Sequence, residues 1–187
     1  VQAAGIAPER CIHTHPVKRD ADIRKALDYG VTTFVADNLD EIAKFRRYRD
    51  RVRLILRVSH RSPDAMVDLS RKFGCAPEAA IGLVEGAARA GIAIAGFSFH
   101  VGSQVANADA HACAIGICAR LIEEGRQRGL PPFTVLDIGG GFPIDYLHPA
   151  QPIEQFCRPI RAALAQLPAG IRVISEPGRY ICGPAGF

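Results

Sequence analysis

Residues 135–143 read Val-Leu-Asp-Ile-Gly-Gly-Gly-Phe-Pro, a short apolar run followed by three consecutive glycines. The apolar run predicts a buried strand over residues 133–138. Glycines at 139–141 let backbone N–H groups approach an anion without obstruction from a Cβ atom, as in phosphate-binding nests. The stretch therefore predicts a strand end that binds an anion, and a tight turn without a ligand is the alternative.

A dinucleotide-binding fold is the competing interpretation of the same glycines. Its Gly-x-Gly-x-x-Gly fingerprint requires a third glycine at position 144, where this chain has Ile144. A helix should also begin at once, but Pro143, Pro149 and Pro152 keep the chain extended. These departures count against that fold.

Outward from this strand, apolar runs alternate with segments of helical periodicity. The predicted strands are 11–17, 32–36, 52–58, 92–99, 133–138 and 171–175. The predicted helices are 20–29, one that opens at 37–41, 77–90, 108–128 and 153–167, with a polar connection over 59–74. This alternation indicates an α/β protein with parallel strands. Length favours an open doubly wound sheet, because a closed (β/α)8 barrel needs eight units and usually about 250 residues.

Composition restricts the class of protein. The 187 residues are 48% apolar and 22% charged, which suits one globular domain. No apolar stretch is long enough for a membrane helix, so no membrane is expected as a partner. The densest basic stretch, residues 44–53, contains Asp50 and is interpreted as a solvated helix face, so nucleic acid is not expected as a partner either. The six cysteines form no CxxC pair or zinc spacing, which predicts a reduced cytoplasmic protein without a metal.

Polar side chains stand at the carboxyl end of each predicted strand, where parallel α/β folds bind ligands. Each has a structural alternative, such as a hydrogen-bonded histidine or a capped turn with an internal ion pair. His13 and His15 would suit a metal, but no third ligand is near them in the sequence. The strand-end residues are His13, His15, Asp37, Arg57, His100, Ser103, Asp137, Glu176 and Arg179.

Three motifs together resemble one enzyme family. They are Phe99-His-Val-Gly-Ser-Gln104, Leu136-Asp-Ile-Gly-Gly-Gly-Phe-Pro143 and Ser175-Glu-Pro-Gly-Arg-Tyr180, accompanied by the loop Arg71-Lys-Phe-Gly74. Their order and spacing resemble the pyridoxal-phosphate decarboxylases of alanine racemase-like fold, which act on ornithine, lysine, diaminopimelate or arginine. The resemblance implies a partial (β/α)8 TIM-type barrel of about six βα units, the third to eighth of that family's N-terminal domain.

The resemblance also assigns roles to residues around pyridoxal 5'-phosphate. It implies that His100 stacks on the cofactor ring and that Glu176 pairs with the pyridine nitrogen, and these two are the expected catalytic residues. It implies phosphate binding by Ser103, Arg179 and the three glycines Gly139, Gly140 and Gly141. Arg57 is expected near the cofactor.

The resemblance departs from a whole enzyme in two respects. The Schiff-base lysine of the family belongs to an earlier strand, and its C-terminal β-domain has no counterpart in this sequence. We therefore expect residues 1–187 to form a single, incomplete barrel domain that is inactive alone.

The expected function of the full protein is decarboxylation of a basic amino acid, ornithine or lysine, in polyamine biosynthesis, by a cytoplasmic homodimer. Diaminopimelate decarboxylase is one alternative, because Gln104, which follows His-Val-Gly-Ser, resembles that branch of the family. The others are a non-catalytic, decarboxylase-like regulatory protein and a pyridoxal-phosphate carrier.

Overall fold

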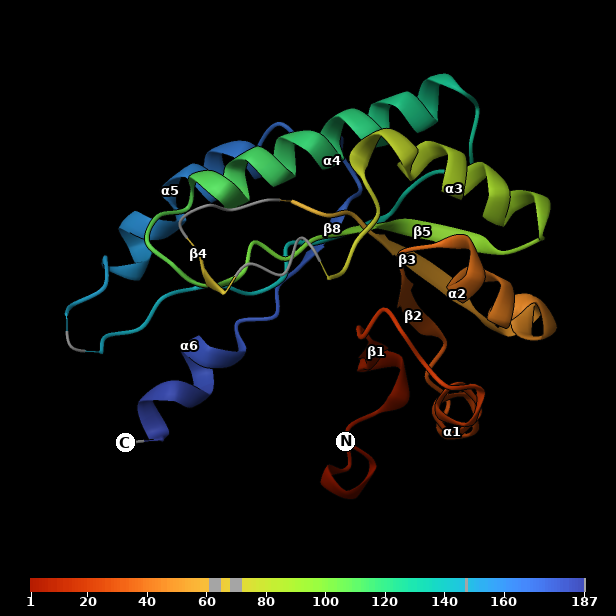
Figure 1. The fold of residues 1–187 in the computed structure, drawn as a ribbon, viewed down its shortest axis with the longest axis horizontal. Helices are drawn as coiled ribbons and strands as arrows, with labels where there is room; N and C mark the ends of the chain where they lie inside the picture. The colour runs from red at the N-terminus through yellow and green to blue at the C-terminus, as the bar shows by residue number, and fades with distance from the viewer. Residues whose placement is uncertain (61–64, 68–71, 147, 187) are drawn as a thin grey trace.

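The computed structural model describes residues 1–60, 65–67, 72–146 and 148–186, so Arg71 of the loop named above lies outside the described residues. A parallel sheet forms the centre, and helices cover it (Figure 1). Its strands are β1 (Ile12–His13), β2 (Thr33–Ala36), β3 (Arg53–Arg57), β5 (Ala93–Ser98), β7 (Val135–Asp137) and β8 (Arg172–Ile174). The helices are α1 (Asp20–Tyr29), α2 (Leu39–Lys44), α3 (Pro77–Arg89), α4 (Asp109–Gln127), α5 (Ile153–Leu164) and α6 (Gly178–Cys182).

The strand order decides between the two architectures. It is β1-β2-β3-β5-β7-β8, and every neighbouring pair is parallel. A doubly wound sheet reverses its order at a switch point, whereas here each new strand adds to the same side of the previous one. The sheet is therefore an arc of a barrel, as the motifs predict, and the open sheet that length favoured is wrong.

The two faces of the sheet are buried by different partners. Alternate strand residues, among them Phe34, Leu54 and Phe97, face the helices and are 0% exposed. The opposite face carries a smaller apolar cluster of Val35, Ile55 and Val135 on the barrel interior. Apolar residues on both faces explain why the strands read as continuous apolar runs.

The first strand is shorter than predicted. Only Ile12–His13 pairs with β2, although the apolar run suggests 11–17. Pro16 lacks an N–H group for the ladder, and the carbonyls of His15 and Pro16 accept hydrogen bonds from the Lys18 ammonium instead. The remaining predicted strands are present with ends trimmed by one or two residues.

A second, small sheet was not predicted. Strand β4 (Ala65–Val67) falls within the supposed polar connection and pairs antiparallel with β6 (Ser103–Val105). Runs of three residues are too short to show a period. Strand β6 is important because it carries Ser103.

Helix α2 begins with one half of a capping box. Asn38 caps it by accepting the N–H of Glu41 at 2.8 Å, as in a capping box. The Glu41 carboxylate does not return to the cap, because Lys18 and Lys44 bind it. Helix α5 ends at Leu164 rather than at 167, and α6 follows the last strand, where no helix was predicted.

Candidate active site

The strand register places apolar and polar side chains in successive layers inside the barrel. Ile55, Gly96 and Val135 are in register across β3, β5 and β7. Two residues further on, Arg57, Ser98 and Asp137 are in register on the same face. A polar layer therefore lies directly above the apolar one, at the carboxyl ends of the strands.

The glycine loop after β7 needs glycine for steric reasons. Gly139 has φ +64°, and a Cβ atom there would lie 2.2 Å from the Phe99 carbonyl oxygen. Gly141 has φ +101°, and its Cβ atom would lie 2.7 Å from the Gly102 oxygen. Neither position tolerates a side chain, because the backbone that follows β5 approaches so closely.

The carbonyls of this loop are held by protein, whereas two of its amides are free. Gly139 O accepts the Glu176 N–H at 2.7 Å, and Gly141 O accepts the Val105 N–H at 3.1 Å. In the described part of the chain, the N–H groups of Gly140 and Gly141 have no hydrogen-bond partner. A loop with pinned carbonyls and free amides is suited to bind an anion.

A hydroxyl and a guanidinium meet beside this loop. Arg179 of α6 donates from Nε to the Ser103 Oγ at 3.0 Å, and its Nη1 donates to the Tyr146 hydroxyl. The Arg179 guanidinium also lies over the Tyr146 ring, 5.8 Å from its centroid. The guanidinium is solvent-exposed and has no carboxylate partner among the described residues, so its charge is available to an anion.

The imidazole of His100 is neutral and lies against the glycine loop. Gly102 donates its N–H to Nδ1 at 3.0 Å, so the ring proton is on Nε2. A Cβ atom at Gly140 would lie 3.2 Å from that Nε2. Burial, followed by the positive charge of Arg57, lowers the pKa of His100 below its ordinary value. The ring therefore presents a flat, uncharged surface at neutral pH.

Two carboxyl groups share the end of β7 and β8. Asp137 is 0% exposed, and its Oδ1 accepts the Gly139 N–H at 2.9 Å, while Oδ2 has no partner among the described residues. Burial, and then repulsion by Glu176, raises the pKa of Asp137 to about 7. Glu176 is exposed. Asp137 therefore carries less negative charge at neutral pH than an ordinary aspartate, and the second acidic group at this edge, Glu176, is open to solvent.

Arg57 supplies a cation at the end of β3. Its guanidinium lies over the Phe73 ring, 5.1 Å from the centroid. Burial lowers the pKa of Arg57, and the carboxylates of Glu176, Asp37 and Asp137 oppose that shift. Arg57 therefore partly balances the acidic groups that follow β2 and β8 and end β7, and its place near a cofactor stays a prediction.

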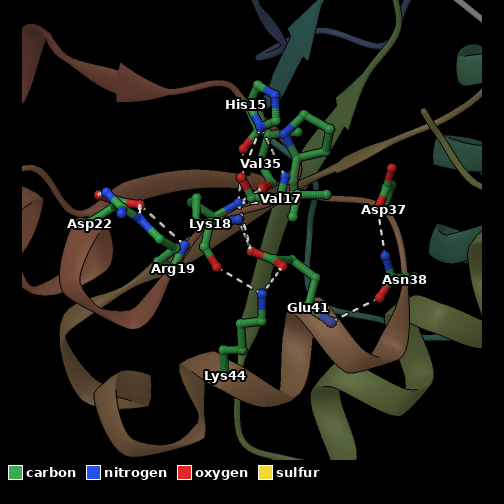
Figure 2. A network of polar contacts seen from close by, with 11 residues as sticks. His15, Val17, Lys18, Arg19, Asp22, Val35, Asp37, Asn38, Glu41 and Lys44 are labelled. Atoms are coloured by element: carbon green, nitrogen blue, oxygen red, sulfur yellow. Dashed lines mark hydrogen bonds and ion pairs between the residues drawn. The ribbon is translucent and has the colours of Figure 1, made fainter. Parts of the chain in front are cut away.

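A buried network around Lys18 fixes the first strands of the site (Figure 2). The Lys18 ammonium donates to the carbonyls of His15, Pro16 and Val35 at 2.9, 3.2 and 2.5 Å. It also pairs with Glu41 Oε1 at 3.0 Å, and the two side chains are 0% and 2% exposed. The network joins the end of β1 to β2 and to α2, and sequence reasoning missed it.

Other missed contacts hold the chain after the glycine loop. The Gln104 amide donates to the Ile144 carbonyl at 2.5 Å and accepts the Ile144 N–H at 3.2 Å. This two-way contact holds the backbone of residue 144, which is not helical, whereas a dinucleotide fold would begin a helix there. Tyr146, the partner of Arg179, has no sequence signal, whereas the positive φ of 55° at Gln104 is the kind of strain that marks functional loops.

The two strand-end histidines contact aromatic rings. His13 stacks on Phe34 with a centroid separation of 5.9 Å, and His15 meets Phe73 edge-on at 5.5 Å. Across the described residues, no group of three or more His, Cys, Asp or Glu side chains is arranged to hold a metal ion. No helix in the same residues is long and apolar enough to cross a membrane.

Together these groups offer anion-binding amides, a cation with a hydroxyl, a flat neutral ring and a separate carboxylate. Comparison with known proteins identifies the arrangement. The sequence profile described as "Pyridoxal-dependent decarboxylase, pyridoxal binding domain" matches residues 1–183. The chain belongs to this family. Its cofactor is pyridoxal phosphate, as the motifs predict.

Relatives in this family support the same fold. The lysine/ornithine decarboxylase of Selenomonas ruminantium is 35% identical over 182 residues, which cover 97% of this chain and 46% of the relative. The structure of a Vibrio vulnificus lysine/ornithine decarboxylase complexed with putrescine matches with TM-score 0.92 and 49% identity, over 98% of this chain and 48% of that one. The Paramecium bursaria Chlorella virus arginine decarboxylase bound to agmatine matches with TM-score 0.87 and 32% identity, over 96% and 48% of the two chains. The chain thus spans about half the length of these relatives.

The described residues fit the cofactor part by part. Its phosphate matches the free amides of Gly140 and Gly141 beside the Arg179–Ser103 pair. Its aromatic ring matches the neutral imidazole of His100, and its basic ring nitrogen matches an exposed carboxylate, Glu176.

Proposed function

We propose that this chain is the cofactor-binding barrel of an enzyme that decarboxylates a basic amino acid, ornithine or lysine. The observation that carries the proposal is the meeting of Arg179, Ser103 and the free amides of the glycine loop at one end of the barrel. These groups come from α6, β6 and the end of β7, so only the folded barrel brings them together.

Each residue has a separate task in this proposal. Arg179 and Ser103, with the amides of Gly140 and Gly141, bind the phosphate and so fix the position of the cofactor. His100 supports the plane of the ring. Glu176 keeps a proton on the ring nitrogen, because a carboxylate stabilises a cationic ring next to it.

When bound, pyridoxal phosphate supplies the electron-withdrawing group that accepts the electron pair left by the departing carboxyl group. The chain contributes the electrostatics of that step. Because its pKa is raised to about 7, Asp137 is about half protonated at neutral pH and carries less negative charge near the ring nitrogen than an ordinary aspartate would. Arg57 offsets the remaining negative charge from the opposite strand.

The choice of ornithine or lysine follows the names of two similar proteins. The Selenomonas ruminantium and Vibrio vulnificus proteins are both named lysine/ornithine decarboxylases. We extend the proposal to polyamine biosynthesis and to a cytoplasmic homodimer, and to residues 1–187 as one barrel domain. The continuous helix-facing core, which runs from Ile23 to Ile160, supports the single domain.

A second candidate function has one observation in its favour. The arginine decarboxylase bound to agmatine shares 32% identity and a TM-score of 0.87 with this chain. A decarboxylation assay with the full-length protein and labelled ornithine, lysine, arginine or diaminopimelate decides among the substrates. Release of labelled carbon dioxide from ornithine or lysine is expected, and release only from another substrate would overturn our choice.

The residue assignment is tested by two substitutions in that protein. Glu176→Ala should lower kcat far more than it weakens cofactor binding, because the phosphate contacts remain. Arg179→Ala should mainly raise the Kd for pyridoxal phosphate. Small and equal effects of both substitutions on kcat and Kd would show that these residues do not bind the cofactor as proposed.

A further inference from the structure

His111 is a polar side chain in apolar surroundings. It lies in the first turn of α4 and is 0% exposed. Its ring contacts the rings of Phe99, Phe142 and Phe156 at centroid separations of 6.4, 5.2 and 5.7 Å. A phenylalanine would fill this space without the cost of removing two ring nitrogens from water, so the imidazole calls for another explanation.

The His111 ring makes its polar contact with one atom, the backbone carbonyl oxygen of Gly140. His111 Nε2 lies 3.0 Å from the carbonyl oxygen of Gly140, and a carbonyl only accepts, so Nε2 carries the proton and donates it. Burial lowers the pKa of His111 to about 4, which keeps the ring neutral at physiological pH. Nδ1 has no hydrogen-bond partner among the described residues. The bond to Gly140 is therefore the one polar contact that offsets this ring's burial in the part of the chain described.

The bond to Gly140 also determines where the next amide points. No cis peptide bond occurs in the described chain, so the Gly140 C=O and the Gly141 N–H point in opposite directions. The carbonyl faces α4, which lies along the helical side of the sheet (Figure 1). The Gly141 N–H therefore points away from α4.

This peptide has little else to hold it. It joins two glycines, which have the weakest steric barriers to backbone rotation. Neither the Gly140 N–H nor the Gly141 N–H has a hydrogen-bond partner in the described ranges. Rotation of the peptide would turn the Gly141 N–H towards α4 and remove it from the anion site.

We propose that His111 is a positioning residue for the cofactor phosphate: it holds the Gly140 carbonyl and so presents the Gly141 N–H to the phosphate group. This inference rests on the proposed function, because it takes the glycine loop as the phosphate site. His111 acts through the loop and does not itself touch the phosphate.

The test compares binding of pyridoxal phosphate and of pyridoxal, which lacks the phosphate, to the full-length protein. His111→Phe keeps an aromatic ring among the phenylalanines but removes the donor. It should raise the Kd for pyridoxal phosphate roughly tenfold, as expected for one lost hydrogen bond, and leave the Kd for pyridoxal unchanged. His111→Gln places an amide donor at a similar reach and should restore most of the affinity.

Phe156→Leu is the matched control, since Phe156 contacts the same ring but not Gly140. It should lower stability without changing the ratio of the two Kd values. If His111→Phe does not fold, His111→Met removes the same donor with a more adaptable side chain.

Two results would overturn the inference: an unchanged ratio of the two Kd values in the donor-free variant, which includes an equal loss of both ligands, or the same ratio change in Phe156→Leu. By contrast, a folded wild-type protein that binds no pyridoxal phosphate would refute the proposed function itself.

Discussion

Replacing Lys18 by methionine tests whether the buried network of Figure 2 stabilises the barrel. The substitution keeps an unbranched apolar chain but removes the ammonium. Glu41 then stays 2% exposed with one carboxylate oxygen deprived of its cation, and three carbonyls lose a donor. Removal of one partner from a buried ion pair costs about 3–5 kcal/mol, and we expect the free energy of unfolding to fall by that amount.

The assay is urea unfolding of the full-length protein, with two matched variants. Arg126→Met breaks an ion pair with Glu123 whose side chains are 72% and 41% exposed, so it should cost less than about 1 kcal/mol. The double variant Lys18→Met/Glu41→Leu removes the Glu41 carboxylate as well. It should be more stable than Lys18→Met alone, because it removes a buried carboxylate that has kept Lys44 but lost its buried cation.

The reasoning would be refuted if Lys18→Met cost no more than Arg126→Met. In that case Lys44, which contacts Glu41 Oε2 at 2.6 Å, or water would compensate for the lost ammonium, and Lys18 would not be the cation that the buried carboxylate needs. A double variant less stable than Lys18→Met would likewise show that the buried Glu41 carboxylate is not the reason why Lys18→Met loses stability.

Three further outcomes are expected. The pKa of Asp137 is raised from 3.8 to about 7, so its contribution to the free energy of unfolding is complete below pH 3.8 and is lost as the pH rises to about 7. Asp137→Asn should remove this pH dependence. Parallel plots of unfolding free energy against pH for variant and wild type would contradict it. Gly139→Ala should lower stability in thermal unfolding more than the control Gly129→Ala does. Both glycines have positive φ, but of the two only Gly139 would place a Cβ atom 2.2 Å from a backbone atom. The control should lose about 1–2 kcal/mol, and equal losses would contradict the steric argument. Tyr146→Phe frees the Nη1 of Arg179 and should raise the Kd for pyridoxal phosphate a few-fold, which an equilibrium titration would detect.

The sequence predicts the fold where its signals are long or chemically specific. Helices α3 and α4 begin and end within a residue of their predicted bounds, and the sheet is parallel. The choice of a barrel came from the motifs, since length pointed to an open sheet. The three-residue strands β4 and β6 escaped prediction because such short runs show no period and pair across a long stretch of chain.

The site was predictable as a set of strand ends but not as a set of contacts. That Gly139 and Glu176 lie together follows from adjacent parallel strands, and their backbones indeed form a hydrogen bond. That Arg179 reaches both Ser103 and Tyr146 depends on α6, a helix that was not predicted. The burial of Lys18 was the least predictable feature. Nothing in the sequence around this lysine indicates that three carbonyls and a carboxylate, rather than water, surround its ammonium group. The roles of the site residues themselves remain predictions.

The strand order also has a consequence for how the molecule is made. Each strand pairs with the one laid down before it in the same sheet, as Ile12 does with Thr33 and Val135 with Arg172. Contacts of this kind close loops of a few tens of residues, so the sheet can grow from its N-terminal edge while the ribosome is still adding later strands. The exceptions are the contacts of the site: Arg179 with Ser103 spans 76 residues. Synthesis would therefore complete the sheet first and the Arg179–Ser103 contact last. A nascent chain that stalls before Arg179 would contain most of the sheet but lack the cation of the proposed phosphate site.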